Sequence, residues 1–171
     1  MTIFLIGFMG SGKTTIGKKL ATKLKCEFID LDAVIEQAEG RYIRDIIADS
    51  GESYFRKVES QSLQQLDLID KVIATGGGTP YYFDNMDWMK INGIAVYIEL
   101  DEGVLFSRLK TTNLENRPLL KGLDDEGLKK FIHDKLEERG PYYYQAQVVF
   151  DPMKESLENL VDAINDIPRL Y

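Results

Sequence analysis

The chain alternates between short apolar runs and longer segments in which apolar residues recur every three or four positions. The short runs predict strands buried on both faces, at residues 3–6, 28–31, 72–74, 94–100 and 148–150. The longer segments predict helices, at residues 14–25, 33–39, 52–66, 102–110, 128–139 and 156–166. Strands that alternate with helices indicate an α/β fold, with a parallel sheet covered on both faces. Such sheets bind ligands beyond the carboxyl ends of their strands, so we expect the functional motifs to gather there.

Length and composition favour a single domain over residues 1–171, because 44% hydrophobic residues suffice for a core. The net charge of −7 argues against sequence-independent binding to nucleic acid, which needs a basic surface. No apolar run is long enough to span a membrane, and the first residues lack the basic and apolar regions of a signal peptide. We therefore expect a cytoplasmic protein whose partners include neither nucleic acid nor membrane.

A phosphate-binding pattern lies between the first predicted strand and the first predicted helix. It reads Gly-x4-Gly-Lys-[Ser/Thr], and glycines at 7, 10 and 12 let the backbone curl around a polyphosphate at a helix N-terminus. Lys13 adds a cation for the β- and γ-phosphates, and the Thr14 hydroxyl adds a ligand for Mg²⁺. The alternative is an ordinary glycine-rich turn with a surface lysine.

Two carboxylates end the second predicted strand. Asp30 and Asp32 are two positions apart, so in an extended chain their side chains point to the same side. One carboxylate near Thr14 could support Mg²⁺ through water, and the next could accept a hydrogen bond from a substrate hydroxyl. Solvated aspartates, or a helix N-cap at Asp32, are the alternatives.

An arginine occupies an unfavourable place near the start of the predicted helix 52–66. The positive charge of Arg56 opposes the helix dipole there. An anion or a carboxylate partner explains this conflict, and Glu59 at i+3 is one such partner. A plain surface arginine is the alternative.

Three successive glycines, Gly76, Gly77 and Gly78, follow the predicted strand 72–74. They indicate that something approaches the backbone closely, and a ligand is the natural explanation. A tight turn between a strand and a helix is the alternative, although one glycine usually suffices for such a turn.

Residues 111–126 lack a long hydrophobic period and surround the block Arg117-Pro118-Leu119-Leu120. We interpret them as a mobile lid that delivers Arg117 to a transferring phosphoryl group and excludes water on closure. A disordered surface loop is the alternative.

Together these motifs make the chain similar to the shikimate kinases, small P-loop kinases of aromatic amino-acid biosynthesis. The matching blocks run in order through nearly the whole chain, at residues 7–15, 28–36, 51–59, 74–78, 117–120 and 139–142. The phosphate loop alone indicates only a nucleotide-binding superfamily, whereas the later blocks together point to this family. Two departures are a slightly longer spacing between Arg108 and Arg117 and Tyr142 where the family commonly has leucine.

The resemblance implies a three-layer P-loop kinase fold with a five-stranded parallel sheet in the order 2-3-1-4-5. It further implies a lid at about 111–126 and a shikimate-binding region at about 32–60. The implied reaction transfers the γ-phosphoryl group of ATP to the 3-hydroxyl of shikimate. The implied partners are ATP and shikimate, with Mg²⁺ as cofactor, and the expected state is a monomer.

The resemblance also assigns roles to individual residues. Catalytic roles fall to Lys13, Asp32 and Arg117, and metal binding falls to Thr14 and Asp30. The implied ATP-binding residues are Gly10, Ser11, Gly12, Lys13, Thr14, Thr15, Arg108, Arg117 and Lys154. The implied shikimate-binding residues are Asp32, Arg56, Gly76, Gly77, Gly78 and Arg139. Whether Asp32 removes a proton or only orients the hydroxyl is left open.

Other functions are weighed beside this one. A gluconate-kinase-like enzyme would share the phosphate loop and the lid. A nucleotide-dependent switch or a non-catalytic ATP-binding module is a third class, but the chain has no Asn-Lys-x-Asp motif for reading guanine. An inactive relative is disfavoured because Lys13, Asp32, Arg56, Arg117 and Arg139 are all present.

Overall fold

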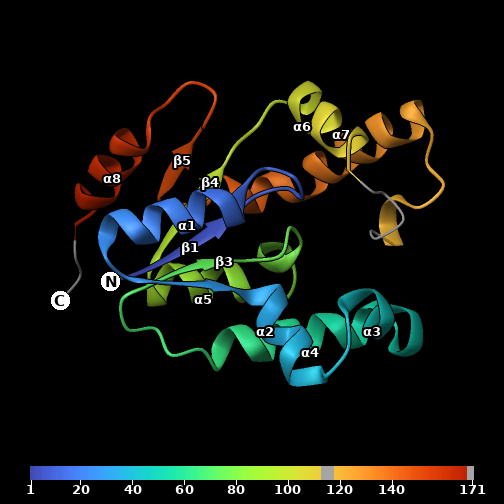
Figure 1. Cartoon of the computed structure of the whole chain (residues 1–171), viewed down its shortest axis with the longest axis horizontal. Helices are drawn as coiled ribbons and strands as arrows, with labels where there is room; N and C mark the ends of the chain where they lie inside the picture. The colour runs from blue at the N-terminus through green and yellow to red at the C-terminus, as the bar shows by residue number, and fades with distance from the viewer. Residues whose placement is uncertain (113–117, 169–171) are drawn as a thin grey trace.

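The computed structural model describes residues 1–112 and 118–168, and strands alternate with helices along the chain (Figure 1). The strands are β1 (Thr2–Ile6), β2 (Glu27–Asp30), β3 (Lys71–Ala74), β4 (Ile94–Ile98) and β5 (Val148–Phe150). The α-helices are α1 (Lys13–Leu24), α2 (Leu31–Glu39), α3 (Ile43–Ser50), α4 (Glu52–Gln64), α5 (Asn85–Asn92), α6 (Glu102–Lys110), α7 (Asp125–Tyr143) and α8 (Leu157–Asn165). Two short 3-10 helices are η1 (Thr79–Tyr81) and η3 (Pro118–Leu120).

The five strands form one parallel sheet in the order β2-β3-β1-β4-β5, as the family resemblance implies. Ala74 pairs with Leu5 on one side and with Asp30 on the other, so the carboxyl ends of β1, β2 and β3 are level. The segments that leave these three ends are therefore neighbours in space. They carry the phosphate-loop pattern, the two aspartates and the three glycines.

The side chains of β1 alternate between the two faces of the sheet. Ile3 and Leu5 pack into a core with residues of α1 and α8, while Phe4 and Ile6 pack into a second core with residues of α2, α3, α4 and α5. Figure 1 shows the same three layers, with α1 and α8 on one side of the sheet and α5 on the other. The predicted covering of both faces is confirmed.

A third apolar cluster joins α6 to α7 beside the phosphate loop. It contains Phe8, Leu105, Leu109, Leu120 and Ile132, all nearly or fully buried. Leu120 belongs to η3, within the predicted lid, so this part of the segment is folded against the body of the protein. Arg117 lies outside the described residues.

Several predicted boundaries were wrong, and two helices were not predicted. The strand expected at 28–31 ends at Asp30, because Asp30 caps α2 and Leu31 begins that helix. Both β2 and β5 lie at the edges of the sheet and are only partly buried. The helix expected at 128–139 begins at Asp125, since the Asp124 side chain accepts a bond from the Gly127 amide. The helices α3 and α5 have eight residues each, too short for a clear period.

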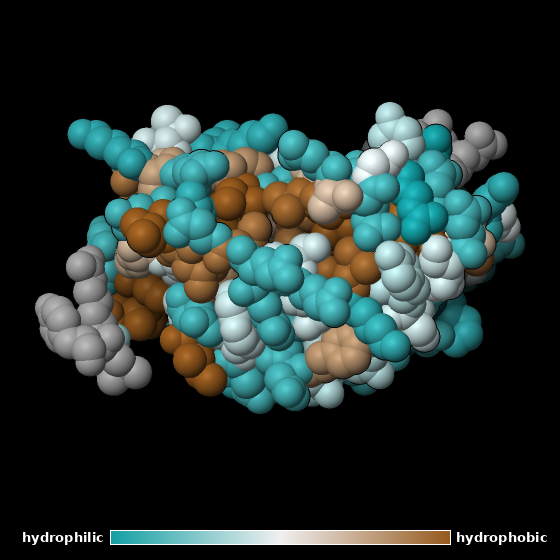
Figure 2. Space-filling model, turned by 90° about the horizontal axis from the view of Figure 1, so that it is seen from below, coloured by the Kyte–Doolittle hydropathy of each residue, from teal (hydrophilic) through white to brown (hydrophobic). Residues whose placement is uncertain are grey.

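The face shown in Figure 2 has hydrophilic residues around and between patches of hydrophobic ones. Ile69 and Ile91 are the most exposed large apolar side chains among the described residues, at 76% and 82%. Within residues 1–112 and 118–168, no helix combines the length and apolar character needed to cross a bilayer.

Candidate functional site

A cleft of about 1040 Å³ lies where the carboxyl ends of β1, β2 and β3 meet α3, α4, α6 and α7. Most of the residues proposed for the site line this cleft: Gly10, Gly12, Lys13, Thr14, Thr15, Asp30, Asp32, Arg56, Gly76, Gly77, Gly78, Arg108 and Arg139. Ser11 and Lys154 are not among the lining residues, and Arg117 falls in the part of the chain that the structure does not describe. The cleft thus brings together motifs that are far apart in the sequence.

The phosphate-loop segment has the backbone of an anion cradle. Gly7, Gly10 and Gly12 have φ angles of 138°, 79° and 99°, values that side chains strongly disfavour. Gly12 is the N-cap of α1, and no side chain caps this helix or places an acid in its first turn. The first amides of α1 are therefore left for an anion. The Lys13 ammonium donates to the carbonyls of Gly7 and Phe8 at 2.8 Å each, so it lies over the loop.

Arg108 lies against the phosphate loop. Its Nη1 donates to the carbonyls of Gly10 and Ser11 at 3.3 and 3.2 Å, and its Nη2 contacts the Met153 sulfur at 3.8 Å. Ser11 is fully buried, and its hydroxyl has no hydrogen-bond partner among the described residues. Lys154 is mostly exposed and pairs with Asp151 at 2.8 Å. The ATP-binding roles that the resemblance implies for Arg108 and Lys154 stay predictions.

Asp30 and Asp32 both line the cleft, but not as residues of one extended strand. Asp30 ends β2 and caps α2, with its side chain accepting a bond from the Asp32 amide at 3.2 Å. Asp32 stands in the first turn of α2. The expected extended geometry was wrong because a short polar side chain can bond the amide two residues on and start a helix.

A hydroxyl and a carboxylate meet at the start of α1. Thr14 Oγ1 donates to Asp30 Oδ2 at 3.0 Å. Such a pair fits Mg²⁺, which takes few protein oxygens and completes its shell with waters and phosphate oxygens. Over the described residues no three His, Cys, Asp or Glu side chains come together as a metal cage. A metal here would therefore depend on the phosphates of a bound nucleotide.

Asp32 is the carboxyl group of the cleft with the most perturbed pKa. Its side chain is open to the cleft, yet the surrounding protein desolvates it and raises the pKa to about 6. The negative charges of Glu59 and Asp30 contribute to this rise in the pKa, and Lys13 opposes it. The pKa of Asp32 therefore lies closer to neutral pH than that of an ordinary aspartate, and a group that accepts a proton is most effective when its pKa is near the working pH.

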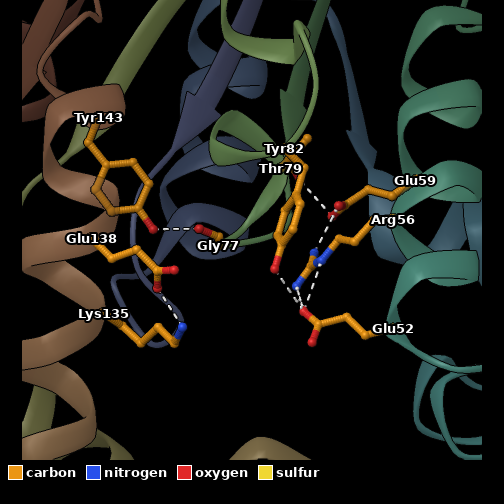
Figure 3. Close-up of polar contacts among 9 residues, drawn as sticks. All are labelled: Glu52, Arg56, Glu59, Gly77, Thr79, Tyr82, Lys135, Glu138 and Tyr143. Atoms are coloured by element: carbon orange, nitrogen blue, oxygen red, sulfur yellow. Dashed lines mark hydrogen bonds and ion pairs between the residues drawn. The ribbon is translucent and has the colours of Figure 1, made fainter.

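Arg56 is held by two glutamates of its own helix (Figure 3). Its Nη1 donates to Glu59 at 2.9 Å, and its Nε and Nη2 donate to Glu52 at 3.2 and 3.0 Å. Glu59 is completely buried and also accepts a bond from the Thr79 hydroxyl at 2.6 Å. The predicted Arg56–Glu59 pair is confirmed, and Glu52 is a second partner.

The three glycines line the cleft and are packed closely against other protein groups. A methyl group added at Gly76 would lie 2.5 Å from a Glu59 carboxylate oxygen, and one at Gly78 would lie 2.9 Å from the Arg56 guanidinium. One at Gly77 would lie 3.2 Å from the Met9 amide nitrogen. The close approach that the sequence indicates is therefore made in part by the protein's own side chains.

Arg139 lies on α7, across the cleft from α4, and only 3% of its surface is exposed. Its buried Nε has no hydrogen-bond partner among the described residues. No carboxylate within that part of the chain forms an ion pair with it. The nearby Tyr143 hydroxyl bonds the Gly77 carbonyl and fixes α7 to the glycine loop (Figure 3). A buried cation whose nitrogen lacks an acceptor is unstable unless a ligand supplies one.

We predict that Glu59→Gln lowers the free energy of unfolding by ~3 kcal/mol, because it removes the carboxylate of a buried ion pair and leaves the Nη1 side of Arg56 without its charged partner. Urea unfolding at pH 7 measures this loss. Glu52→Gln is the matched control, since Glu52 pairs with the same arginine but its side chain is 43% exposed. It should lose less than ~1 kcal/mol. Equal losses in the two variants would contradict the buried pair.

Several residues of the site were not predicted individually. Glu52, Thr79, Tyr82 and Tyr143 all take part in the contacts around the two arginines. Glu52 stands four residues before Arg56 in the sequence, and this spacing could have suggested an ion pair. The others act through contacts between distant segments, for which the sequence offers no local signal.

The comparisons with known proteins agree in pointing to one family. A family model described as shikimate kinase matches residues 9–167. A shikimate kinase of Bacteroides fragilis is 44% identical, with 86% of this chain and 83% of that protein covered. One of Parabacteroides distasonis is 41% identical, with 96% and 95% covered.

Solved structures give the same result. The crystal structure of shikimate kinase from Bacteroides thetaiotaomicron has a TM-score of 0.85 and 38% identity, over 96% of this chain and 94% of that one. Shikimate kinase from Acinetobacter baumannii in complex with shikimate also has a TM-score of 0.85, with 32% identity over 98% and 95% of the two chains. A deoxyadenosine kinase from M. mycoides, at 18% identity and a TM-score of 0.59, shares the fold alone. The chain belongs to the shikimate kinase family.

Proposed function

We propose that the protein is an ATP-dependent kinase that phosphorylates the 3-hydroxyl of shikimate, giving 3-phosphoshikimate and ADP in aromatic amino-acid biosynthesis. Membership of the family supports the reaction, and the solved relative with shikimate bound supports the acceptor. One feature of this chain carries the proposal. One cleft holds a phosphate cradle together with two arginines from opposite walls, and one of these has a buried nitrogen without an acceptor in residues 1–112 and 118–168.

On the acceptor side, Arg56 and Arg139 are proposed to bind the shikimate carboxylate. A planar guanidinium matches a carboxylate, and its bonds are strengthened by charge. The charge of Arg56 is already balanced by Glu52 and Glu59, so Arg139 supplies most of the attraction. Gly76, Gly77 and Gly78 would add backbone contacts. Asp32 is proposed to accept a hydrogen bond from the reacting hydroxyl and to take up its proton.

On the nucleotide side, the proposed ATP ligands are the amides of Gly10, Ser11, Gly12, Thr14 and Thr15 together with Lys13, which would leave its carbonyl partners for the β- and γ-phosphates. Arg108 and Lys154 are proposed to lie near the adenine. Thr14 and Asp30 are proposed to hold Mg²⁺, which when bound neutralises charge on the β- and γ-phosphate oxygens. These residues would thus hold the triphosphate in the orientation needed for transfer of its γ-phosphoryl group within the cleft.

The remaining parts of the proposal concern the chain as a whole. Residues 1–171 act as one kinase domain, with the acceptor region at about 32–60 and a lid at about 111–126 that closes over the cleft. The lid would bring Arg117 to the transferring phosphoryl group and exclude water, which otherwise competes as an acceptor. We propose that the enzyme works as a monomer in the cytoplasm, where its donor ATP is available.

The test is an assay that couples ADP release to an absorbance change, with ATP and Mg²⁺ present. Shikimate, gluconate and no acceptor are compared in parallel. Rapid ADP release with shikimate alone is expected. Release with gluconate in preference would favour a gluconate-kinase-like activity, and ADP formed equally in all three would contradict the acceptor. Binding of ATP without any turnover would favour an ATP-binding module.

A further inference from the structure

The aromatic side chain of Tyr82 contacts Arg56, although Tyr82 is not one of the residues that line the cleft. Tyr82 directly follows η1, and its ring centroid lies 4.4 Å from the Cζ atom of Arg56. Its hydroxyl donates to Glu52 Oε1 at 3.1 Å, the same oxygen that accepts two bonds from Arg56. Figure 3 shows Tyr82 beside the Arg56 guanidinium, with dashed lines from both side chains to Glu52. Tyr82 is not among the residues that line the cleft, and these contacts are with Arg56 and Glu52.

The buried pair with Glu59 anchors the Nη1 group of Arg56, whereas the side of the guanidinium that faces Glu52 is held less firmly. Three of its five N–H groups bond to Glu52 and Glu59, which leaves two within the described part of the chain. Glu52 is partly exposed, and such a pair alone holds a long side chain weakly. The ring of Tyr82 covers the guanidinium, and a cation over an aromatic ring gains a further attraction. The hydroxyl of Tyr82 also fixes the oxygen of Glu52 that Arg56 uses.

The Tyr82 ring is itself held in place. It packs edge to face on Tyr81 with centroids 5.0 Å apart, and Tyr81 packs in the same way on Tyr142 of α7 at 5.2 Å. These contacts connect the Arg56 wall of the cleft to α7, the helix that carries Arg139. The ring therefore provides a fixed surface for the guanidinium.

We propose that Tyr82 is a positioning residue, which holds the Arg56 guanidinium in the orientation that receives the carboxylate of the acceptor. The inference rests on the proposed function, because it assigns the acceptor carboxylate to Arg56. Its two contacts make separable contributions: the ring covers the cation, and the hydroxyl fixes Glu52. Loss of the hydroxyl should therefore do less harm than loss of the whole side chain.

The kinetic test uses Tyr82→Phe and Tyr82→Leu with shikimate and ATP. The phenylalanine variant keeps the ring and should raise the KM for shikimate ~3-fold. The leucine variant loses both contacts and should raise it ~20-fold, with kcat and the KM for ATP changed less than ~2-fold. Partial rescue by phenylalanine separates positioning from general packing. An unchanged KM for shikimate in the leucine variant, or an equal rise in the KM for ATP, would overturn the inference.

Tyr54 provides the matched control. It lies two residues before Arg56 on α4, its hydroxyl bonds Glu39 at 3.2 Å, and it does not line the cleft. Tyr54→Phe and Tyr54→Leu should leave the KM for shikimate unchanged. If the Tyr54 variants and the Tyr82 variants raise this KM alike, then loss of packing on α4 explains the effect and the inference fails.

A second measurement does not depend on turnover. The Nε–Hε signal of Arg56 in a nitrogen-15 spectrum is identified by its loss in Arg56→Lys. Exchange of this hydrogen with water should accelerate ~10-fold in Tyr82→Leu, and not in Tyr54→Leu, because the guanidinium loses the ring of Tyr82 and keeps only its contact with the Phe55 ring among the described aromatic residues. If the protein fails to phosphorylate shikimate, the proposed function fails, and this exchange rate still decides the role of Tyr82. Should the leucine variant not fold, Tyr82→Phe is measured in its place, with ~3-fold acceleration expected.

Discussion

Replacement of Arg139 by methionine should raise the KM for shikimate at least ~100-fold and lower kcat. The change removes a buried cation that would bond a carboxylate, and a charged hydrogen bond of this kind is worth ~3 kcal/mol, or roughly two powers of ten. The KM for ATP should change less than ~2-fold. Methionine fills much of the volume of the arginine stem, so packing on α7 is kept. Initial rates at varied shikimate and fixed ATP measure the effect.

The stability of Arg139→Met should move in the opposite direction to that of Glu59→Gln. Only 3% of the surface of Arg139 is exposed, and the residue has no ion-pair partner in the described chain. Its charge therefore lowers the stability of the folded state. Its removal should leave the melting temperature unchanged or raise it. A fall of several degrees, or an equal loss of affinity for ATP and shikimate, would show that Arg139 is a structural residue and not a ligand of the acceptor. Arg139→Lys should not restore the KM, because an ammonium lacks the planar fork.

The sequence predicted the larger features of the fold well. Strands such as β1 and β3 are short, apolar and buried on both faces, and the helices between them are long enough for a period to show. The strand order came from the family resemblance and is confirmed. By contrast, α3 and α5 are two turns long. Such short helices derive their stability from packing against the body of the protein, which local sequence does not record.

The site could be predicted to the level of single motifs, but not to the contacts between them. The glycines before Lys13 indicate the phosphate loop, because few other residues adopt the positive φ angles that this loop requires. The geometry predicted for Asp30 and Asp32 was wrong, because the chain does not stay extended after Asp30 but begins a helix that Asp30 caps. The contacts that support the two arginine walls join distant segments, since Thr79 bonds Glu59 at a separation of 20 residues and Tyr143 bonds Gly77 at a separation of 66 residues. Contacts at that separation depend on the sheet order, and therefore become visible only in the folded chain.

The dependence of turnover on pH should reflect the carboxyl group of Asp32. We expect kcat/KM for shikimate to fall below about pH 6, because kcat/KM reports the free enzyme and the pKa of Asp32 is raised to about 6 there. Asp32→Asn should lower kcat ~1000-fold, the usual contribution of a positioned proton acceptor, and should abolish this acid limb. Rates between pH 5 and pH 8 measure both effects. An acid limb that persists in the asparagine variant would assign it to another group.

Asp32→Asn should also stabilise the protein, because the pKa of Asp32 is raised in the folded state. A carboxyl group whose pKa rises on folding, here from 3.8 to about 6, binds protons more tightly in the native state. Its ionisation therefore lowers the free energy of unfolding as the pH rises through this window, fully above pH 6 and not at all below about 3.8. Asparagine carries no charge and avoids this loss. With allowance for screening by water in the cleft, the gain at pH 7.5 should be ~1 kcal/mol, or about 3 °C in melting temperature.

Asp30→Asn is the matched control for that gain. It removes one charge two residues away, and asparagine caps a helix as well as aspartate does. Because the charge of Asp30 is only one of several causes of the raised pKa of Asp32, the melting temperature should rise by less than in Asp32→Asn. Asp30→Asn should instead raise the concentration of Mg²⁺ needed for turnover, since Asp30 accompanies Thr14 at the start of α1. Melting curves of both variants at pH 5 and pH 7.5 decide the matter. A gain for Asp32→Asn that is as large at pH 5 as at pH 7.5 would contradict the raised pKa, because the burden has developed only in part at pH 5, between the unfolded pKa of 3.8 and the folded pKa of about 6.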